Sequence, residues 1–146
     1  MKTRILIVDD EEKFADYLNK RLVNRGFDVS VAFSGEEAIE KIKEANFDVV
    51  ILDVLMPGID GIEALRAIKN LKPLTEVIML TGHASVESGV EGMKLGAYDY
   101  LMKPCDTDEL VSKINKAYER KAEQEDRIRE AKVSRILSSP RSVLED

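Results

Sequence analysis

Cysteine, histidine and tryptophan are nearly absent from this chain of 146 residues, which has one Cys, one His and no Trp. The single thiol, Cys105, cannot form a disulfide within the chain, and this favours a reducing compartment. We assign Cys105 no chemical role. Because no second histidine is present, His83 is expected to be an exposed loop residue and not a metal ligand.

Long apolar runs and an excess of basic residues are also missing. No stretch approaches the roughly 20 apolar residues that span a bilayer, and the N-terminal MKTRILIVDD runs into acids without a small-residue cleavage site. The formal net charge of −6 argues against a broad nucleic-acid-binding face and against attraction to anionic lipid. We therefore expect a cytoplasmic protein with no direct nucleic-acid or membrane partner.

Apolar and charged residues are plentiful, at 44% and 34% of a chain long enough for one core. The chain is organised around residues 47–58, FDVVILDVLMPG. Its β-branched apolar run predicts a strand buried on both faces, and Pro57 with Gly58 predicts a sharp loop after it. Asp53 is then expected at the carboxyl end of a central strand, where open α/β sheets bind their ligands.

Strand and helix patterns alternate along the chain. Strands are expected at residues 4–8, 27–33, 47–52, 76–80 and 98–102, and helices are expected to begin near residues 11, 34, 60, 86 and 106. This alternation predicts a doubly wound α/β fold with a five-stranded parallel sheet. The first, third and fourth strands are the apolar ones and should be central, which fits the flavodoxin-like order 2-1-3-4-5 with the alternating second strand at an edge.

Local signals refine two of these helices. Ser34 followed by Glu37 is a capping-box pattern for the second helix. Gly89 and Gly92 lie inside the fourth helix, so that helix is weak by intrinsic propensity and is a candidate mobile element.

The last part of the chain is almost entirely charged. The segment ERKAEQEDRIRE, from residue 119, predicts that the final helix continues past the folded body into solvent. Its heptad pattern is polar at two successive seam positions, which argues against a stable coiled coil. We expect a folded domain at 1–120, and a charged helical extension with a linker or frayed C-terminus at 121–146.

Acidic side chains follow two strands that should lie side by side. Asp9 and Asp10 end the first strand and Asp53 ends the third, so all three should meet in one crevice. Two unit charges about 4 Å apart repel by roughly 4 kcal/mol at an effective dielectric near 20. The cluster therefore needs a compensating cation, and oxygen-only ligands suit Mg²⁺. Lys103, after the fifth strand, is the candidate internal cation, and Thr81, after the fourth, offers a hydroxyl.

This set of groups suits phosphoryl transfer. Charge on the transferred group lies on its equatorial oxygens, so catalysis consists largely of positioning and electrostatics. The acceptor should be a carboxylate that can become an acyl phosphate, and Asp53 is placed for that role.

With these residues in these positions, the chain resembles the response-regulator receiver domains of bacterial two-component signalling. The resemblance covers residues 4 to about 120, with VDDEE at 8–12, VILDVLMPGIDG at 50–61, LTG at 80–82 and GAYDYLMKP at 96–104. It implies that Asp53 is the phosphoacceptor, Asp10 a direct Mg²⁺ ligand and Asp9 mainly a ligand through water. The backbone carbonyl of Leu55 would complete the metal set.

The resemblance also implies a switch. Thr81 and Lys103 would hold phosphoryl oxygens, and Tyr100 would turn inward as Thr81 moves, remodelling the face formed by the fourth helix, fifth strand and fifth helix. The phosphoryl donor would be a sensor histidine kinase or phosphotransfer protein. The remodelled face would serve a downstream protein target, the protein's own output domain or a homodimer. Because apolar Leu55 cannot orient a water molecule, self-dephosphorylation should be slow.

Each residue also has an ordinary structural interpretation. Asp9 and Asp10 could cap the first helix, Thr81 could belong to a plain turn, and Lys103 could be a solvated surface lysine. Tyr98 is expected to be a packing residue. Four such coincidences at successive strand ends are improbable together, which favours the joint functional interpretation.

Two other function classes stay open. A phosphatase or phosphotransferase with an aspartate nucleophile would want a second acid two residues after Asp53, where Leu55 stands. A receiver-like module that binds partners without phosphorylation would not need Asp10, Asp53, Thr81 and Lys103 together. We expect a phosphorylated signalling switch and not a turnover enzyme. The chain is either a stand-alone regulator or the receiver of a longer protein. The segment GMKLGAYDYLMKP is most similar to receivers of enhancer-binding transcription activators, which favours the second.

Overall fold

The structure is a computed structural model that describes residues 2–82 and 85–138. Its five strands are β1 (Arg4–Val8), β2 (Asp28–Ala32), β3 (Val49–Leu52), β4 (Glu76–Thr81) and β5 (Asp99–Met102). Its five helices are α1 (Glu12–Asn24), α2 (Gly35–Glu44), α3 (Gly61–Leu71), α4 (Val86–Lys94) and α5 (Thr107–Ser138). Strands and helices alternate as predicted, and most boundaries lie within one or two residues of the expected ones.

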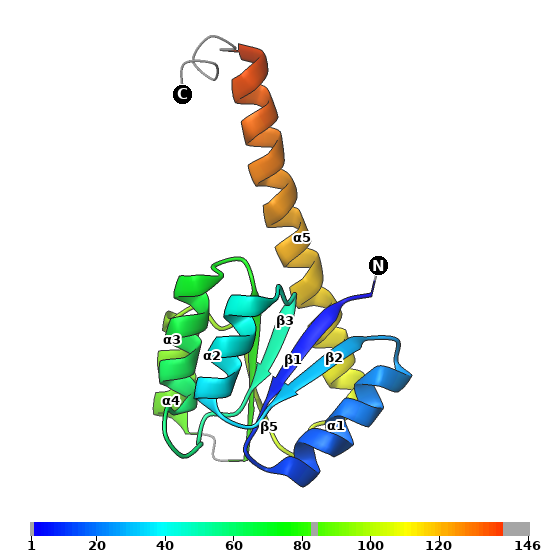
Figure 1. The fold of residues 1–146 in the computed structure, drawn as a ribbon, viewed down its shortest axis with the longest axis vertical. Helices are drawn as coiled ribbons and strands as arrows, with labels where there is room; N and C mark the ends of the chain where they lie inside the picture. Colours follow the sequence, from blue (N-terminus) through cyan, green and yellow to red (C-terminus); the bar gives the residue numbers. More distant parts are fainter. Residues whose placement is uncertain (1, 83–84, 139–146) are drawn as a thin grey trace.

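The strands form one parallel sheet in the order β2-β1-β3-β4-β5 (Figure 1). This confirms the predicted flavodoxin-like order, with β1, β3 and β4 central and β2 at an edge. The register pairs Val8 with Leu52 across β1 and β3, so the residues that follow these two strands emerge next to each other.

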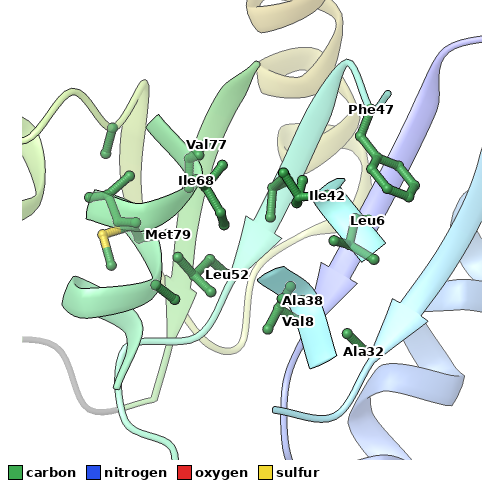
Figure 2. Packing of buried hydrophobic residues seen from close by; sticks show 14 of the residues in the cluster. Leu6, Val8, Ala32, Ala38, Ile42, Phe47, Leu52, Ile68, Val77 and Met79 are labelled. Atoms are coloured by element: carbon green, nitrogen blue, oxygen red, sulfur yellow. The ribbon is translucent and has the colours of Figure 1, made fainter. Parts of the chain in front are cut away.

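Helices cover both faces of the sheet (Figure 1). Helices α2, α3 and α4 lie on one face, and α1 and α5 lie on the other. Figure 2 shows the first layer, in which Ala38 and Ile42 of α2 and Ile68 of α3 pack on side chains of the central strands. The predicted two-sided burial of β3 is confirmed: Val50 and Leu52 belong to this layer, whereas Val49 and Ile51 pack against α1 and α5.

The helix starts have specific caps. Ser34 accepts a hydrogen bond from the N–H of Glu37, and Asp60 accepts one from the N–H of Glu63. The capping box expected at Ser34 is formed differently, because the Glu37 carboxylate accepts the N–H of Phe33, one residue earlier in the chain. At α4 the box is complete and uses Ser85 and Ser88, which the sequence analysis did not identify.

The last helix extends far beyond the sheet, as predicted. Its buried residues are Leu110, Ile114 and Ala117, and after these the helix runs on to Ser138 as a projecting stem (Figure 1). Two ion pairs lie where it leaves the body: Arg120 with Glu76 of β4, and Lys121 with Asp48 just before β3. The linker or frayed C-terminus expected within 121–146 is not described past Ser138. Within residues 2–82 and 85–138, no helix has the length and apolar character needed to cross a membrane.

Candidate functional site

Three carboxylates meet at the carboxyl ends of β1 and β3. Ligand oxygens of Asp9, Asp10 and Asp53 all lie within 4.8 Å of one another. Asp9 and Asp53 are each 2% exposed, whereas Asp10 is exposed. The parallel pairing of β1 with β3 is what brings them together, because it places residues 9 and 53 directly after paired strand ends. The predicted meeting of these three carboxylates is therefore confirmed.

Lys103 supplies positive charge to this crevice, as the sequence predicted. Its Nζ lies 2.7 Å from Asp9 Oδ2, 3.7 Å from Asp53 Oδ2 and 3.3 Å from Glu11 Oε1. The same Nζ lies 4.2 Å from the centroid of the Phe14 ring, which gives a cation–π contact. The sequence analysis did not identify Glu11 or Phe14 as partners of Lys103. Their only signal was position, just after Asp9 and Asp10 at the start of α1.

Burial and the neighbouring charges shift the pKa values of Asp9 and Lys103. Burial raises the pKa of Asp9 above its ordinary value, and the Asp53 carboxylate adds to that rise. The hydrogen bonds from Lys103 and from the N–H of Glu11 act against it. For Lys103, burial lowers the pKa, but its hydrogen bond to Asp9 and its attraction to Asp53 and Asp9 outweigh burial, so the pKa is raised. Because more carboxylates than ammonium groups meet here, the protonated, positively charged form of Lys103 is stabilised.

One oxygen of Asp53 has unmet bonding capacity. Asp53 Oδ1 is buried, and no hydrogen-bond donor reaches it from the residues that the structure describes. A buried carboxylate oxygen without a donor is costly unless a cation or a bound group compensates it. The donor set of the pocket is made only of oxygens, which fits Mg²⁺.

The loop after β3 carries Leu55, whose side chain is 57% exposed while its neighbours Val54 and Met56 are buried. The N–H of Gly61 donates to the carbonyl of Val54 at 2.7 Å and closes the loop. A Cβ at Gly61 would lie 2.2 Å from the carbonyl oxygen of Asp53, so only glycine allows α3 to start this close to the site. The role of the Leu55 carbonyl as a metal ligand stays a prediction.

The two proposed switch residues lie on β4 and β5. Thr81 is the last residue of β4 and is fully buried, and its carbonyl accepts the backbone N–H of Lys103 at 2.9 Å. The Tyr100 hydroxyl lies 2.7 Å from Ser88 Oγ and accepts the N–H of Ser85 at 3.3 Å. Tyr100 therefore links β5 to the first turn of α4.

Predictions from the sequence also concern Tyr98, His83 and Cys105. Tyr98 packs in the layer with α1 and α5, and its ring lies under the Arg120 guanidinium at 4.6 Å, as expected of a packing residue. His83 lies outside the described residues. Burial and the nearby acids Glu109 and Asp106 raise the pKa of the Cys105 thiol, which disfavours the reactive thiolate.

Known proteins with similar sequences are regulators. Residues 5–115 match the model of the response regulator receiver domain. The transcriptional regulatory protein ZraR of Escherichia coli is 43% identical over 113 residues, which are 77% of this chain and 26% of ZraR. ResD of Bacillus subtilis is 41% identical over 123 residues, which are 84% of this chain and 50% of ResD. The chain thus spans about a quarter to a half of these relatives.

Solved structures agree with this match. A CheY-like receiver domain protein from Methanospirillum hungatei superposes with a TM-score of 0.82 and 32% identity, over 85% of this chain and 99% of that one. A receiver domain protein from Clostridium thermocellum gives a TM-score of 0.79 and 37% identity, over 82% and 97% of the two chains. The family model covers most of the chain, and the sheet order and the acidic crevice agree with it, so this chain belongs to the response regulator receiver family of two-component signalling.

Proposed function

We propose that this receiver accepts a phosphoryl group on Asp53 in a Mg²⁺-dependent reaction, from a phosphohistidine of a sensor histidine kinase or phosphotransfer protein. The observation that carries the proposal is the buried Asp53 Oδ1, which has no donor from the described residues, in a pocket shared with Asp9, Asp10 and Lys103. A carboxylate held in this way has a free oxygen for a new bond and a cation beside it to offset charge.

The metal site would be formed by carboxylate oxygens of Asp9, Asp10 and Asp53 together with the backbone carbonyl of Leu55. A bound Mg²⁺ supplies charge neutralisation for the phosphoryl oxygens and holds them near the acceptor. Asp9 is already engaged by Lys103 at 2.7 Å, which supports the idea that Asp9 acts mainly through water.

In the transfer step, an Asp53 carboxylate oxygen forms the new P–O bond while the P–N bond of the donor breaks. The electron pair of that bond stays on the departing imidazole nitrogen, which takes up a proton from solvent. The Lys103 ammonium and the Thr81 hydroxyl are the residues of this chain proposed to stabilise the phosphoryl oxygens. Lys103 lies 3.7 Å from Asp53 Oδ2 without the phosphoryl group, so only a small movement would be needed.

The output is proposed to be a population shift. Phosphorylated Asp53 draws the Thr81 side chain inward, Tyr100 turns toward the space that Thr81 leaves, and the face formed by α4, β5 and α5 changes. The hydrogen bonds of Tyr100 to Ser85 and Ser88 link that ring to α4 and support the route. The shift can be no larger than the difference with which the phosphoryl group stabilises the two states. Thr81→Ala should therefore remove phosphorylation-dependent partner binding, and unchanged binding would place the coupling elsewhere.

The chain is proposed to be a switch and not a turnover enzyme, because Leu55 stands where an aspartate-dependent phosphatase would want a general acid. Its partners would be the donor protein and either a downstream protein, an output domain of its own protein or a second copy bound through α4, β5 and α5. ZraR and ResD are named transcriptional regulatory proteins and extend well beyond the matched region, which supports an output in transcription. No direct nucleic-acid contact is proposed for the receiver itself.

The experiment that tests this function incubates the purified chain with acetyl phosphate in Mg²⁺ or in a chelator, and follows both protein-bound phosphate and donor consumption. We expect one acid-labile phosphate per chain, formed only with Mg²⁺, and donor consumption that slows once the chain is labelled. Steady rapid donor turnover would support the phosphatase alternative. Absence of labelling together with Mg²⁺-independent partner binding would support the interaction module.

A further inference from the structure

The amino end of α2 lies against the loop that connects β3 to α3. A Cβ added at Gly35 would lie 2.9 Å from the carbonyl oxygen of Ile59 and 3.1 Å from its Cβ. The close approach therefore requires glycine at this position of the helix. Ser34 caps the same helix end, so the first turn of α2 is held in place where it meets the loop.

Glu36 connects this helix end to the loop by a direct hydrogen bond. Its Oε1 accepts the backbone N–H of Ile59 at 2.8 Å, across 23 residues of sequence. The same N–H lowers the pKa of Glu36, because it stabilises the charged carboxylate. Gly58 has a φ of +77°, and a Cβ there would lie 2.7 Å from Glu36 Oε1. Glycine at position 58 thus allows both the turn and the approach of the carboxylate.

The loop has further attachments. Buried Val54 and Met56 anchor its first half in the core, and the side chain of Ile59 packs against the same core layer. The hydrogen bond from the Gly61 N–H to the Val54 carbonyl closes the loop at the start of α3. Between these attachments the side chain of Leu55 is exposed. The hydrogen bond from the Ile59 N–H to Glu36 attaches the second half of the loop to α2.

We propose that Glu36 is a positioning residue for the phosphorylation pocket. Its charge-assisted hydrogen bond to the Ile59 N–H holds the loop at residues 54–60. That loop carries Leu55, whose backbone carbonyl is the proposed metal ligand. Residues that hydrogen-bond to the ligands of a metal site, or support them, orient those ligands. Removing such residues commonly lowers the affinity for the metal. The inference rests on the proposed function, since it concerns the Mg²⁺ site of that function.

Calorimetric titration with MgCl₂, without any phosphodonor, measures the expected effect. Glu36→Ala should weaken Mg²⁺ binding about tenfold, at the lower end of what such contacts give. Glu36→Gln keeps an oxygen acceptor for the Ile59 N–H and should bind within about twofold of wild type. Glu40→Ala is the matched control, because it removes the same charge from the same helix at an exposed position whose recorded ion pair is with Lys43. Wild-type affinity in Glu36→Ala, or equal losses in the Gln and Ala variants, would overturn the inference.

Amide hydrogen exchange supplies a readout that general destabilisation would not reproduce. In Glu36→Ala the Ile59 amide should exchange much faster, while the amides of β3 keep wild-type rates. Uniformly faster exchange through β3 and α2 would mean that Glu36 only stabilises the fold, and this would contradict the inference.

The result is separable from a failure of the proposed function. If wild type binds Mg²⁺ with the predicted dependence on Glu36 but takes up no phosphate, the proposed function fails and the positioning role stands. If Asp53 is labelled while Glu36→Ala binds Mg²⁺ as wild type does, the positioning role alone fails.

Discussion

Lys103 is the residue on which the charge balance of the pocket depends. Lys103 directly follows the carboxyl end of β5 and contacts Asp9, Glu11 and Asp53, and only 12% of its side chain is exposed. The lysine was predictable from sequence because it follows the fifth strand directly. Its contact with the ring of Phe14 was not, because that contact depends on the rotation of α1 about its axis.

Leu55 gives a prediction about the lifetime of the phosphoryl group. Its exposed side chain lies on the loop next to Asp53 and offers no hydrogen bond to a hydrolytic water. Leu55→Asn should speed loss of phosphate from labelled protein about tenfold, the effect of one hydrogen bond worth about 1 kcal/mol or slightly more. Decay is measured after removal of the donor. Leu71→Asn, at an exposed leucine at the end of α3, is the control. Equal decay in wild type and Leu55→Asn would contradict the prediction.

Asp9 gives a prediction about pH. Its folded-state pKa is raised above the ordinary 3.8, chiefly by burial, so the folded state holds that proton more tightly than the unfolded state does. The contribution of Asp9 to stability therefore falls as pH rises from about 3.8 through the folded-state pKa, and is constant above it. Asp9→Asn should remove this fall.

Urea unfolding without Mg²⁺, from about pH 4 to about pH 7, measures the effect. Relative to Asp9→Asn, the free energy of unfolding of wild type should decrease across the lower part of that range. Asp16→Asn, at an exposed position on α1, is the control variant. A difference between wild type and Asp9→Asn that does not vary with pH would refute the account of the Asp9 pKa.

At the scale of elements, most of the sheet could be predicted, because the pattern of apolar residues in each strand indicates which of its faces are buried. Continuous apolar runs gave the central strands and alternation gave β2 as an edge, and the structure confirms both. Strand ends were less predictable, since they depend on pairing with neighbours: Phe27 and Phe33 lie outside β2, although the alternating pattern includes them. The contact from Glu36 to Ile59 has no local signal, because it joins residues far apart in sequence.

The weak helix α4 gives a prediction at this scale. A Cβ at Gly89 would lie 3.6 Å from the Tyr100 ring, an ordinary contact, whereas one at Gly92 would lie 2.7 Å from Met79 Sδ. Gly89→Ala should therefore raise the free energy of unfolding by about 0.5–1 kcal/mol through helix propensity. Gly92→Ala should gain less, because buried Met79 must move. Urea unfolding compares the two, and a Gly89→Ala variant no more stable than Gly92→Ala would contradict the prediction.

At the scale of the whole molecule, the stem of α5 leaves the body on the side of the amino ends of the strands (Figure 1). Asp9, Asp10 and Asp53 meet at the opposite side, at the carboxyl ends of β1 and β3. Glu76, at the start of β4, is 2% exposed and pairs with Arg120 of α5 and Lys69 of α3. Burial lowers the pKa of Lys69, although Glu76 acts against that shift. The run of charged residues from position 119 predicted the stem. The sequence did not predict the contacts of Glu76 with Arg120 and Lys69, because Glu76 looks like an ordinary polar residue at the start of an apolar strand.

Arg120→Ala tests this attachment. It leaves buried Glu76 with Lys69 as its remaining cation and should lower the free energy of unfolding by about 1–2 kcal/mol, less than for a fully buried pair because Arg120 is half-exposed. Arg129→Ala removes a guanidinium from an exposed pair with Asp126 further along the stem and should change stability by about 0.5 kcal/mol or less. Urea unfolding measures both. Equal effects would mean that Glu76 does not fix the stem.

The central claim is that Asp53 is the residue that takes the phosphoryl group. It is tested most directly by the intact mass of wild type and Asp53→Asn after identical treatment with acetyl phosphate and Mg²⁺, followed by peptide mapping of the labelled protein. The account predicts one phosphate on wild type, located at Asp53, and none on Asp53→Asn, with both proteins folded by circular dichroism. A phosphate of equal yield on Asp53→Asn, or a label mapped to another residue of wild type, would contradict it.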